Sequence, residues 1–409
     1  MAEHDLDQAL QRAGGARMSR RGFLQASALT GAAAALAACT STSPSASAPA
    51  ATAAGPSTAP SVGGASLAPS EAAAATPAPS YEIEKQLYMY NWSQYISPKN
   101  IDTFKQRYGV EKFQYDVYDN NDALLAKLQA GGGGYDIASP TAEFVPGMVE
   151  QGFVQKLDKG RLPNLANIDP VFKGLWWDPG DDYLIPKDYG TTGILYRSTL
   201  LPSVPKSWKD FNDLIKGAAS GKTVFVDSMG DVFVFPLKML GFSANSVDKD
   251  ELDQARTVLL DVAPHLLALD SNTYGTKMAK GEASLALGWT GVLEQQMSKV
   301  ADKGYVVPSD GTIFWLDTWV LLDGAPNPNA GYAWLDFIQE PDIQAEESNY
   351  NLYATPNDKA RPLVDPKILN NPAIFPSEEQ VKALEGSKDT SSNTQRLDIY
   401  EEFKQNIGK

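Results

Sequence analysis

The chain has 409 residues, of which 43% are hydrophobic, and a formal net charge of −15 at pH 7. Residues 1–80 contain four arginines and four acidic residues, so the excess of negative charge lies in residues 81–409, which argues against a nucleic-acid partner. The single cysteine excludes an internal disulfide, so packing alone must hold the fold.

The first 39 residues have the features of an export signal. The pair Arg20-Arg21 precedes an uncharged stretch at 26–38 that is too short to span a bilayer as an ordinary helix. Cys39 follows small residues, and this ending resembles the lipobox of bacterial lipoproteins. We expect residues 1–39 to be a twin-arginine lipoprotein signal peptide with Cys39 as the lipid-attachment site. The alternative is a buried thiol beside a chance apolar run.

Residues 40–80 are almost entirely Ala, Ser, Thr, Pro and Gly, with Glu71 as the only charge. Such a composition cannot bury a core, so it predicts a disordered tether. The body, residues 81–409, is larger than one hydrophobic core usually supports, which predicts two lobes. No stretch of the body approaches the length of a membrane span, so we expect the body to be soluble.

Strand and helix patterns alternate along the body, which predicts an α/β fold with βαβ units and a mainly parallel sheet. In chain order the patterns are a strand at 85–90, a helix at 101–108, a strand at 114–117, a helix at 122–129, strands at 135–138 and 193–196, a helix opening at the N-cap Ser207, a strand at 223–226, helices at 232–240 and 250–262, strands at 284–288 and 318–322, and helices at 332–338 and 399–405. Four glycines at 131–134 lack the Lys-Ser/Thr ending of a P-loop and precede a strand, so we interpret them as a plain connection.

The residue types argue against catalysis by a nucleophile and a histidine. Of the two histidines, His4 lies in the signal, and His265 has no partner for a triad or a His-rich metal site, so we expect it to be structural. Acids are plentiful enough for glycoside hydrolysis, but no spacing singles out a catalytic pair.

Aromatic residues beside polar groups recur next to the predicted strands. Trp92 and Tyr95 follow the first strand, Trp289 follows another, and Trp315 with Asp317 precedes a third. Because the loops at the carboxyl ends of strands form the binding crevice of an open α/β sheet, these residues predict an aromatic box. Any one tryptophan taken alone is more often a core residue.

From about residue 85 to residue 409 the chain resembles the spermidine/putrescine-binding proteins of polyamine ABC transporters. The matching stretches occur in that family's order and spacing, and they are YNWSQY at 90–95, YDIASP at 135–140, VF at 232–233 with LGF at 240–242, GTIFWLD at 311–317 and YATPN at 353–357. The resemblance implies a two-lobed periplasmic-binding-protein fold, in which crossover strands join two mainly parallel sheets flanked by helices. It assigns residues 81–192 and 317–361 to lobe 1, and residues 193–316 and 362–409 to lobe 2.

The same resemblance implies the ligand contacts. The expected ligand-binding residues are Trp92, Tyr95, Thr141, Glu143, Asp231, Trp289, Trp315, Asp317 and Tyr353, with aromatic walls around the ligand and Asp231 and Asp317 facing its amino groups. The chemistry agrees, because aromatic faces cover methylenes and attract cations by roughly 0.5 to 2 kcal/mol per contact. A buried ammonium group without a carboxylate partner would be costly.

Three departures concern the carboxylates. Ser228 stands where the spermidine binders carry an acid, and Val292 stands where the putrescine binders carry one, although Asp227 is adjacent to Ser228. Glu143 stands where the family usually has Ser or Tyr, and we hypothesise that it replaces one lost carboxylate; the alternative is a solvated loop acid. A family glutamine near the C-terminus does not align cleanly, so the nearby Asp389, Thr390 and Gln395 receive no role.

The expected mechanism is ligand capture in the interlobe cleft, hinge closure, and delivery to the permease subunits of an ABC transporter. We expect a monomer without catalytic residues, metal or cofactor, anchored through Cys39 on the outer side of the cytoplasmic membrane. Two alternatives remain open at this point. One is a protein of the same fold that binds a sugar, an amino-acid derivative or ferric ion, and the other is an exported two-carboxylate glycoside hydrolase.

Overall fold

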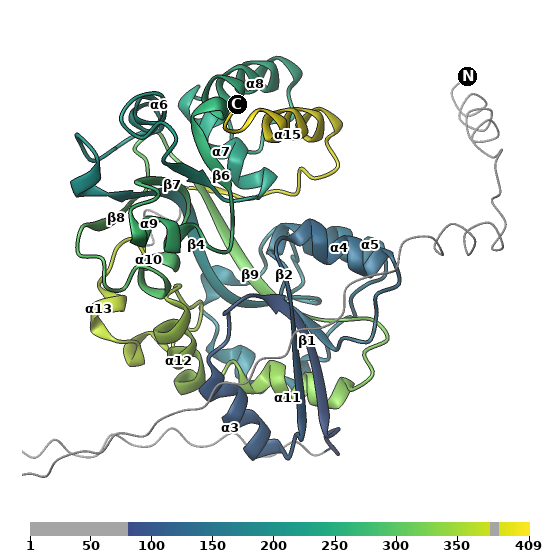
Figure 1. Cartoon of the computed structure of the whole chain (residues 1–409). Coiled ribbons are helices and arrows are strands. Elements are labelled where there is room, and N and C mark those ends of the chain that lie inside the picture. The colour runs from purple at the N-terminus through teal and green to yellow at the C-terminus, as the bar shows by residue number, and fades with distance from the viewer. Residues whose placement is uncertain (1–80, 377–383) are drawn as a thin grey trace, which may run out of the picture. The chain divides into compact units, whose positions relative to one another are not determined.

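The computed structural model describes residues 81–376 and 384–409. The predicted signal peptide, tether and Cys39 lie outside these residues. Helices and strands alternate through most of the described chain, as expected for an α/β protein (Figure 1). No helix in these two ranges is both long and apolar enough to cross a bilayer.

The strands of the described chain form one mixed sheet in the order β2-β1-β3-β9-β4-β7-β5-β6, with β10 beside β9 and β8 beside β4. Their bounds are β1 Gln86–Trp92, β2 Lys112–Tyr118, β3 Ile137–Ala138, β4 Ile185–Arg197, β5 Thr223–Phe225, β6 Leu266–Leu269, β7 Leu285–Trp289, β8 Lys303–Val306, β9 Ile313–Leu321 and β10 Glu385–Gly386. Every antiparallel pair includes β4 or β9, and the other pairs are parallel.

Helices flank this sheet (Figure 1). Their bounds are α3 Pro98–Tyr108, α4 Asn121–Gln129, α5 Val145–Glu150, α6 Trp208–Lys216, α7 Met229–Met239, α8 Lys249–Val262, α9 Tyr274–Lys280, α10 Val292–Gln295, α11 Pro328–Phe337, α12 Pro341–Asn351, α13 Pro366–Leu369 and α15 Thr394–Asn406, with the short 3₁₀ turn η1 at Ala142–Phe144. The expected N-cap Ser207 is confirmed, since its hydroxyl accepts a hydrogen bond from the backbone N–H of Asp210 at 3.1 Å. Helix α6 then buries Trp208, Phe211, Leu214 and Ile215 on one face.

Two separate hydrophobic cores lie along the sheet. The first surrounds β1, β3 and the early part of β4, and it includes Phe104 and Trp334 from two helices. The second surrounds β5 and β7, and it includes Phe211 and Phe235. Strands β4 and β9 contribute to both cores. The lobe boundaries drawn from sequence remain a prediction.

The two long strands explain why the sheet is mixed. The first part of β4, from Ile185 to Thr191, pairs with β9, and its second part pairs with β7 and β8. Strands β4 and β9 pair antiparallel with each other, β4 does so with β7 and β8, and β9 does so with β3. The pairs β1–β2, β1–β3, β5–β6, β5–β7 and β9–β10 are parallel. The sequence pattern found only residues 193–196 of β4.

The expected positions of Trp315 and Asp317 need a correction. We predicted that both residues precede a strand at 318–322, but β9 begins at Ile313 and contains them. All nine residues of β9 are buried, so no alternation of polar and apolar residues marks where the strand begins. Trp315 and Asp317 therefore stand on a rigid strand.

Candidate ligand-binding pocket

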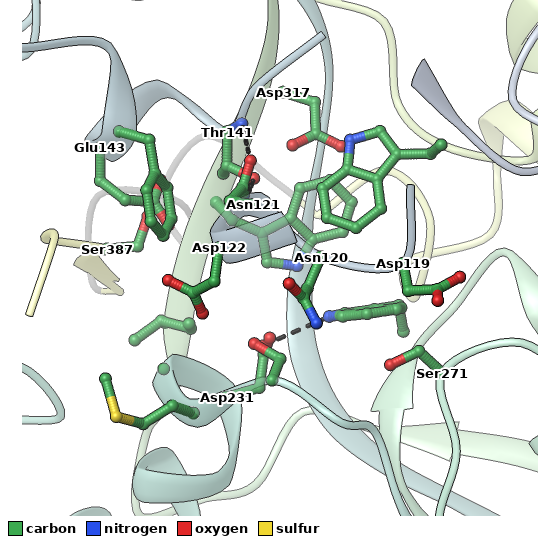
Figure 2. Close-up of a pocket in the computed structure, with 18 of the residues that line it drawn as sticks. Asp119, Asn120, Asn121, Asp122, Thr141, Glu143, Asp231, Ser271, Asp317 and Ser387 are labelled. Carbon is green, nitrogen blue, oxygen red and sulfur yellow. Dashed lines mark hydrogen bonds between the residues drawn. The ribbon is translucent and has the colours of Figure 1, made fainter. Parts of the chain in front are cut away.

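A cavity of about 200 Å³ opens between residues of the two cores (Figure 2). All nine residues expected to bind ligand line it, namely Trp92, Tyr95, Thr141, Glu143, Asp231, Trp289, Trp315, Asp317 and Tyr353. Trp92 ends β1 and Trp289 ends β7, and their ring centroids lie 6.5 Å apart. The tertiary structure therefore gathers side chains that are up to 261 residues apart in sequence, Trp92 and Tyr353 being the extremes.

Three aromatic rings form a cluster of their own, separate from the two cores. The ring centroid of Tyr353 lies 5.3 Å from that of Trp315 and 5.7 Å from that of Tyr95. Gly190 lies so close to Trp315 that a Cβ atom there would be 2.4 Å from Cζ2 of the indole. Gly291 is similarly close to Tyr353. These two glycines let strand and loop backbone support the aromatic wall.

Asp231 is held at the start of α7. Its Oδ1 accepts hydrogen bonds from the Thr192 hydroxyl and from Nε1 of Trp289, the latter at 3.3 Å. Burial raises the pKa of Asp231, and its hydrogen bonds with neighbouring side chains oppose this shift. Figure 2 shows Asp231 across the cavity from Thr141 and Asp317.

Glu143 lies on η1, close to Ser387 (Figure 2). Its Oε2 is buried without a hydrogen-bond partner. Burial raises the pKa of Glu143 to about 8. The structure thus places Glu143 in the pocket wall, which contradicts the alternative of a solvated loop acid.

Thr141 is positioned by the connection between β2 and α4. The side-chain amide of Asn121 donates to the Thr141 hydroxyl at 2.8 Å, and its carbonyl oxygen accepts from the Thr141 backbone N–H at 3.1 Å. Two residues earlier, Asp119 accepts a hydrogen bond at 3.0 Å from Asn272 on the opposite side of the pocket. Sequence reasoning missed this whole connection, because it contains no aromatic residue after Tyr118.

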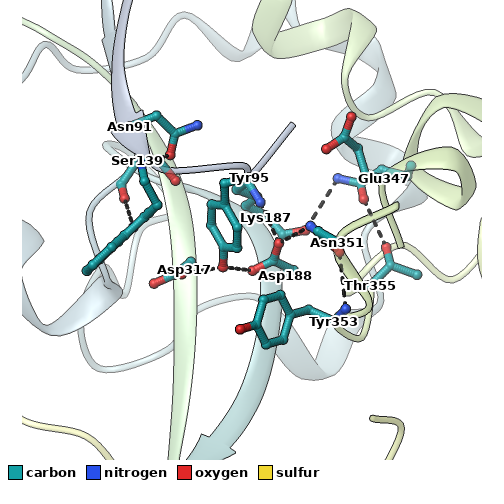
Figure 3. Close-up of polar contacts among 12 residues, drawn as sticks. Asn91, Tyr95, Ser139, Lys187, Asp188, Asp317, Glu347, Asn351, Tyr353 and Thr355 are labelled. Atoms are coloured by element: carbon teal, nitrogen blue, oxygen red, sulfur yellow. Dashed lines mark hydrogen bonds and ion pairs between the residues drawn. The ribbon is translucent and has the colours of Figure 1, made fainter. Parts of the chain in front are cut away.

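Asp317 belongs to a buried polar network that the sequence did not reveal (Figure 3). The Tyr95 hydroxyl lies 2.5 Å from Oδ2 of Asp317 and 2.5 Å from Oδ1 of Asp188. Asp188 also forms an ion pair with the adjacent Lys187, and its Oδ2 accepts from the side chain of Asn351 at 2.8 Å. Burial, together with the charge of Asp188, raises the pKa of Asp317 to about 7.

A bulge in β4 makes this network possible. The register of the β4/β9 pair shifts between Pro186 and Asp188, so Lys187 has no partner on β9. A bulge re-aims side chains, and here Lys187 and Asp188 both reach Tyr95. The ammonium of Lys187 lies 3.3 Å from the centroid of the Tyr95 ring. No sequence pattern indicated this network, because the predicted strand covered only residues 193–196.

The remaining sequence expectations divide between pocket and periphery. Ser228 and Val292, which stand where the related binders carry acids, both line the pocket. The pocket therefore has no carboxylate at either of these two positions. Asp227 instead accepts a hydrogen bond from the Tyr400 hydroxyl at 2.5 Å. Near the C-terminus Thr390 lines the pocket. The side chain of Gln395 bonds to residues of α8.

His265 lies outside the pocket lining, and its Nδ1 is hydrogen-bonded to the Ser220 hydroxyl at 2.8 Å. Within residues 81–376 and 384–409, no cluster of three or more His, Cys, Asp or Glu side chains is suited to hold a metal ion. The pocket lining combines aromatic rings and carboxylates with hydroxyl and amide side chains and the basic residues Lys388 and Arg396.

A family model described as bacterial extracellular solute-binding protein matches residues 99–376. The chain belongs to this family. It is 31% identical over 322 residues to the spermidine/putrescine-binding periplasmic protein of Escherichia coli K12, an alignment that covers 78% of this chain and 91% of the relative. It is 32% identical over 322 residues to a putrescine/agmatine-binding protein of Pseudomonas aeruginosa, with 74% of this chain and 87% of the relative covered.

Solved structures confirm the expected fold for this solute-binding protein. A structure described as a putative spermidine/putrescine ABC transporter from Listeria monocytogenes superposes with a TM-score of 0.74 at 29% identity, covering 78% of this chain and 99% of the other. A solute-binding protein of Agrobacterium tumefaciens B6 in complex with glucopine is only 16% identical, with a TM-score of 0.64, and covers 78% of this chain and 99% of the other. That likeness concerns the fold alone.

Proposed function

We propose that the chain captures a polyamine, putrescine or spermidine, in this pocket and delivers it to the permease of an ABC transporter. One observation carries the proposal. Glu143, Asp231 and Asp317 line an aromatic pocket, burial raises the pKa of each, and none forms an ion pair with a described residue. Ammonium groups on an alkyl chain would neutralise these carboxylates while the methylenes pack on the rings.

Two basic residues line the pocket, Arg396 and the exposed Lys388. Arg396 lines the pocket, but its guanidinium donates to the carbonyl oxygens of Ala244 and Ser246 and to the Thr390 hydroxyl. Each of its nitrogens donates at least one of these bonds, and the side chain is almost fully buried. The arginine thus supports the C-terminal segment and is not free to pair with an anionic ligand.

In this proposal, Asp317 and Asp231 hold two amino groups, and Glu143 supplies the carboxylate that Ser228 and Val292 lack. Trp92, Tyr95, Trp289, Trp315 and Tyr353 enclose the chain, and Thr141 contributes a hydroxyl. Glu143→Gln should weaken binding of at least one polyamine. Unchanged affinity for putrescine, spermidine and spermine alike would refute the role of Glu143.

Capture requires the two lobes to close on the ligand, and a hinge motion needs no covalent chemistry. The relatives are named as binding proteins, and recovery of ligand unchanged after prolonged incubation would argue against the hydrolase alternative. We expect the protein to act as a monomer that presents its closed form to the permease subunits.

Membrane attachment is a separate part of the proposal. Cys39 would carry the lipid on the outer side of the cytoplasmic membrane, with residues 40–80 as the tether. Metabolic labelling with a radioactive fatty acid should mark the wild-type protein and fail to mark Cys39→Ser. Equal labelling of both would contradict the anchor without affecting the ligand assignment.

The ligand is tested with calorimetry and thermal unfolding of the full chain against putrescine, spermidine, spermine and two sugars. A ligand at a hundredfold excess over its Kd adds about 2.7 kcal/mol to the free energy of unfolding. We expect this stabilisation with putrescine or spermidine and none with the sugars. If no polyamine binds, the ligand assignment fails while the family assignment stands.

A further inference from the structure

The two carboxylates beside Tyr95 present a problem of proton number. In the antiparallel pairing of β4 with β9, Asp188 lies directly opposite Asp317. Like charges at such positions destabilise a sheet. The Tyr95 hydroxyl contacts both carboxylates at 2.5 Å (Figure 3). A phenol has one proton and donates one hydrogen bond, so a proton on one of the carboxyl groups would make the second contact a hydrogen bond as well.

The surroundings indicate which carboxyl group holds this proton. Asp188 is paired with the ammonium of Lys187 and accepts from the amide of Asn351, and both interactions stabilise its ionised form. Asp317 forms no ion pair with a described residue. The Tyr95 hydroxyl then donates to Asp188, and protonated Asp317 donates to the Tyr95 oxygen.

The groups that face Asp317 agree with this assignment. They are Tyr95 from the β1–α3 connection, Asp188 and Lys187 from β4, Tyr118 from β2, Thr141 and Glu143 around η1, and Tyr353 after α12. Burial raises the pKa of Asp317 most, Asp188 raises it further, and Lys187 and the hydrogen bonds of Tyr95 and Thr141 lower it. The resulting pKa is about 7, which leaves Asp317 largely protonated in mildly acidic solution.

We propose that the Asp188–Tyr95–Asp317 chain holds one extra proton in the ligand-free pocket, and that a ligand ammonium group takes the place of this proton. The inference rests on the proposed polyamine function. In the exchange, the O–H bond of the Asp317 carboxyl breaks, its proton passes to water, and the carboxylate accepts a hydrogen bond from the ammonium. Lys187 and Asp188 are positioning residues, because they fix the ionised partner of Tyr95 and do not line the pocket.

This exchange links affinity to pH. Well above the pKa of Asp317 the carboxylate is already ionised, and binding releases no proton there. Below that pKa each bound ligand releases up to one proton, and Kd rises up to tenfold for each unit that the pH falls. Because primary amines remain protonated across this range, the ligand itself does not produce the effect. Between about pH 8 and about pH 5.5 the exchange at Asp317 alone should weaken binding roughly thirtyfold.

Calorimetry in buffers of different ionisation enthalpy counts the released protons. Glu143 also has a raised pKa, so the titrations with putrescine and spermidine are performed in Glu143→Gln, with and without Asp188→Asn. When a polyamine binds to Glu143→Gln, we expect close to one proton to be released near pH 6 and almost none near pH 8.5. Asp188→Asn removes the opposing charge, so it should reduce the release near pH 6 while polyamine binding persists.

Carbon-13 NMR of aspartate carboxyl groups tests the proton without any ligand. One signal of the ligand-free protein, absent from Asp317→Asn, should titrate near pH 7 and move to lower pH in Asp188→Asn. Polyamine binding without proton release, or an Asp317 signal that titrates near pH 4, would overturn the inference and leave the proposed function intact. Failure of every polyamine to bind would refute the proposed function, and the NMR titration would still decide the state of Asp317.

Discussion

Asp317 and Glu143 are carboxylates of the same pocket that differ in their position and in their hydrogen-bond partners. Asp317 stands within β9, opposite Asp188 on β4, and touches the Tyr95 hydroxyl. Glu143 stands on a three-residue 3₁₀ turn, and its buried Oε2 has no partner. The comparison shows that one pocket can hold two carboxyl groups with raised pKa, one joined to a second carboxylate through Tyr95 and one whose Oε2 has no partner.

The largest effect on ligand affinity is expected at Asp317. At about pH 8.5, Asp317→Asn should raise the Kd for the preferred polyamine on the order of hundredfold, because an ammonium that loses its buried partner costs about 3 kcal/mol. Calorimetry measures the change. Asp323→Asn removes an exposed acid just after β9 and serves as the control with unchanged affinity. A loss below threefold in Asp317→Asn would show that Asp317 does not hold an amino group.

Glu143 should affect the stability of the ligand-free protein. The pKa of Glu143 is raised from 4.5 to about 8, so the folded state keeps a proton that the unfolded chain loses. The free energy of unfolding therefore falls as the pH rises through this interval. Glu143→Gln removes the contribution of this group to the decrease in the free energy of unfolding. The variant should therefore be more stable than the parent above pH 8, by on the order of 1 to 3 kcal/mol.

Urea unfolding between about pH 5 and about pH 9 measures this difference in stability, which should grow up to about pH 8 and level off above it. The exposed Glu150, on the next helix, offers Glu150→Gln as a control whose difference from the parent stays constant. If the free energies of unfolding of Glu143→Gln and the parent differed by the same amount at all pH values, the raised pKa of Glu143 would be refuted.

A smaller effect is expected at the aromatic wall that the two carboxylates share. Trp289→Leu removes one ring face and should raise Kd roughly fivefold, which corresponds to about 1 kcal/mol of cation–π attraction. Trp176→Leu is the matched control, because Trp176 is 53% exposed and does not line the pocket. Equal effects of both substitutions would place the binding energy elsewhere.

The smallest effect is expected at the contact that spans the pocket. Asn272→Ala removes the 3.0 Å hydrogen bond to Asp119 and should speed ligand dissociation about two- to threefold, because an exposed hydrogen bond contributes about 0.5 kcal/mol. Stopped-flow tryptophan fluorescence measures the dissociation rate. A tenfold change would mean that this contact controls closure, and the carboxylates would then have less weight in retention.

Sequence patterns found the long helices that have an apolar face, but they missed short elements such as β6 and α9 and the polar helix α12. Helix α8 buries Leu252, Ala255, Leu259 and Val262 at helical spacing, and it was predicted almost to its ends. Helix α12 buries Gln344, Glu347, Ser348 and Asn351, so no apolar stripe marked it. That polar face contributes Asn351 to the network behind Asp317.

The sequence by itself determined the chemistry of the pocket. The aromatic residues, Asp231 and Asp317 were recognisable from their motifs, and the α/β class followed from alternating patterns. Glu143 could be named as a departure, because it stands at a position where the family usually has another residue type.

Only the tertiary structure decided how these charges are balanced. Asp188 and Asp317 are 129 residues apart in sequence, and they meet because β4 and β9 pair antiparallel between the two cores. The bulge at Lys187 brings its ammonium to the same carboxylate. A carboxyl group's proton affinity depends on burial and on charges within a few ångströms, so no reading of residue types could reveal which acid keeps its proton.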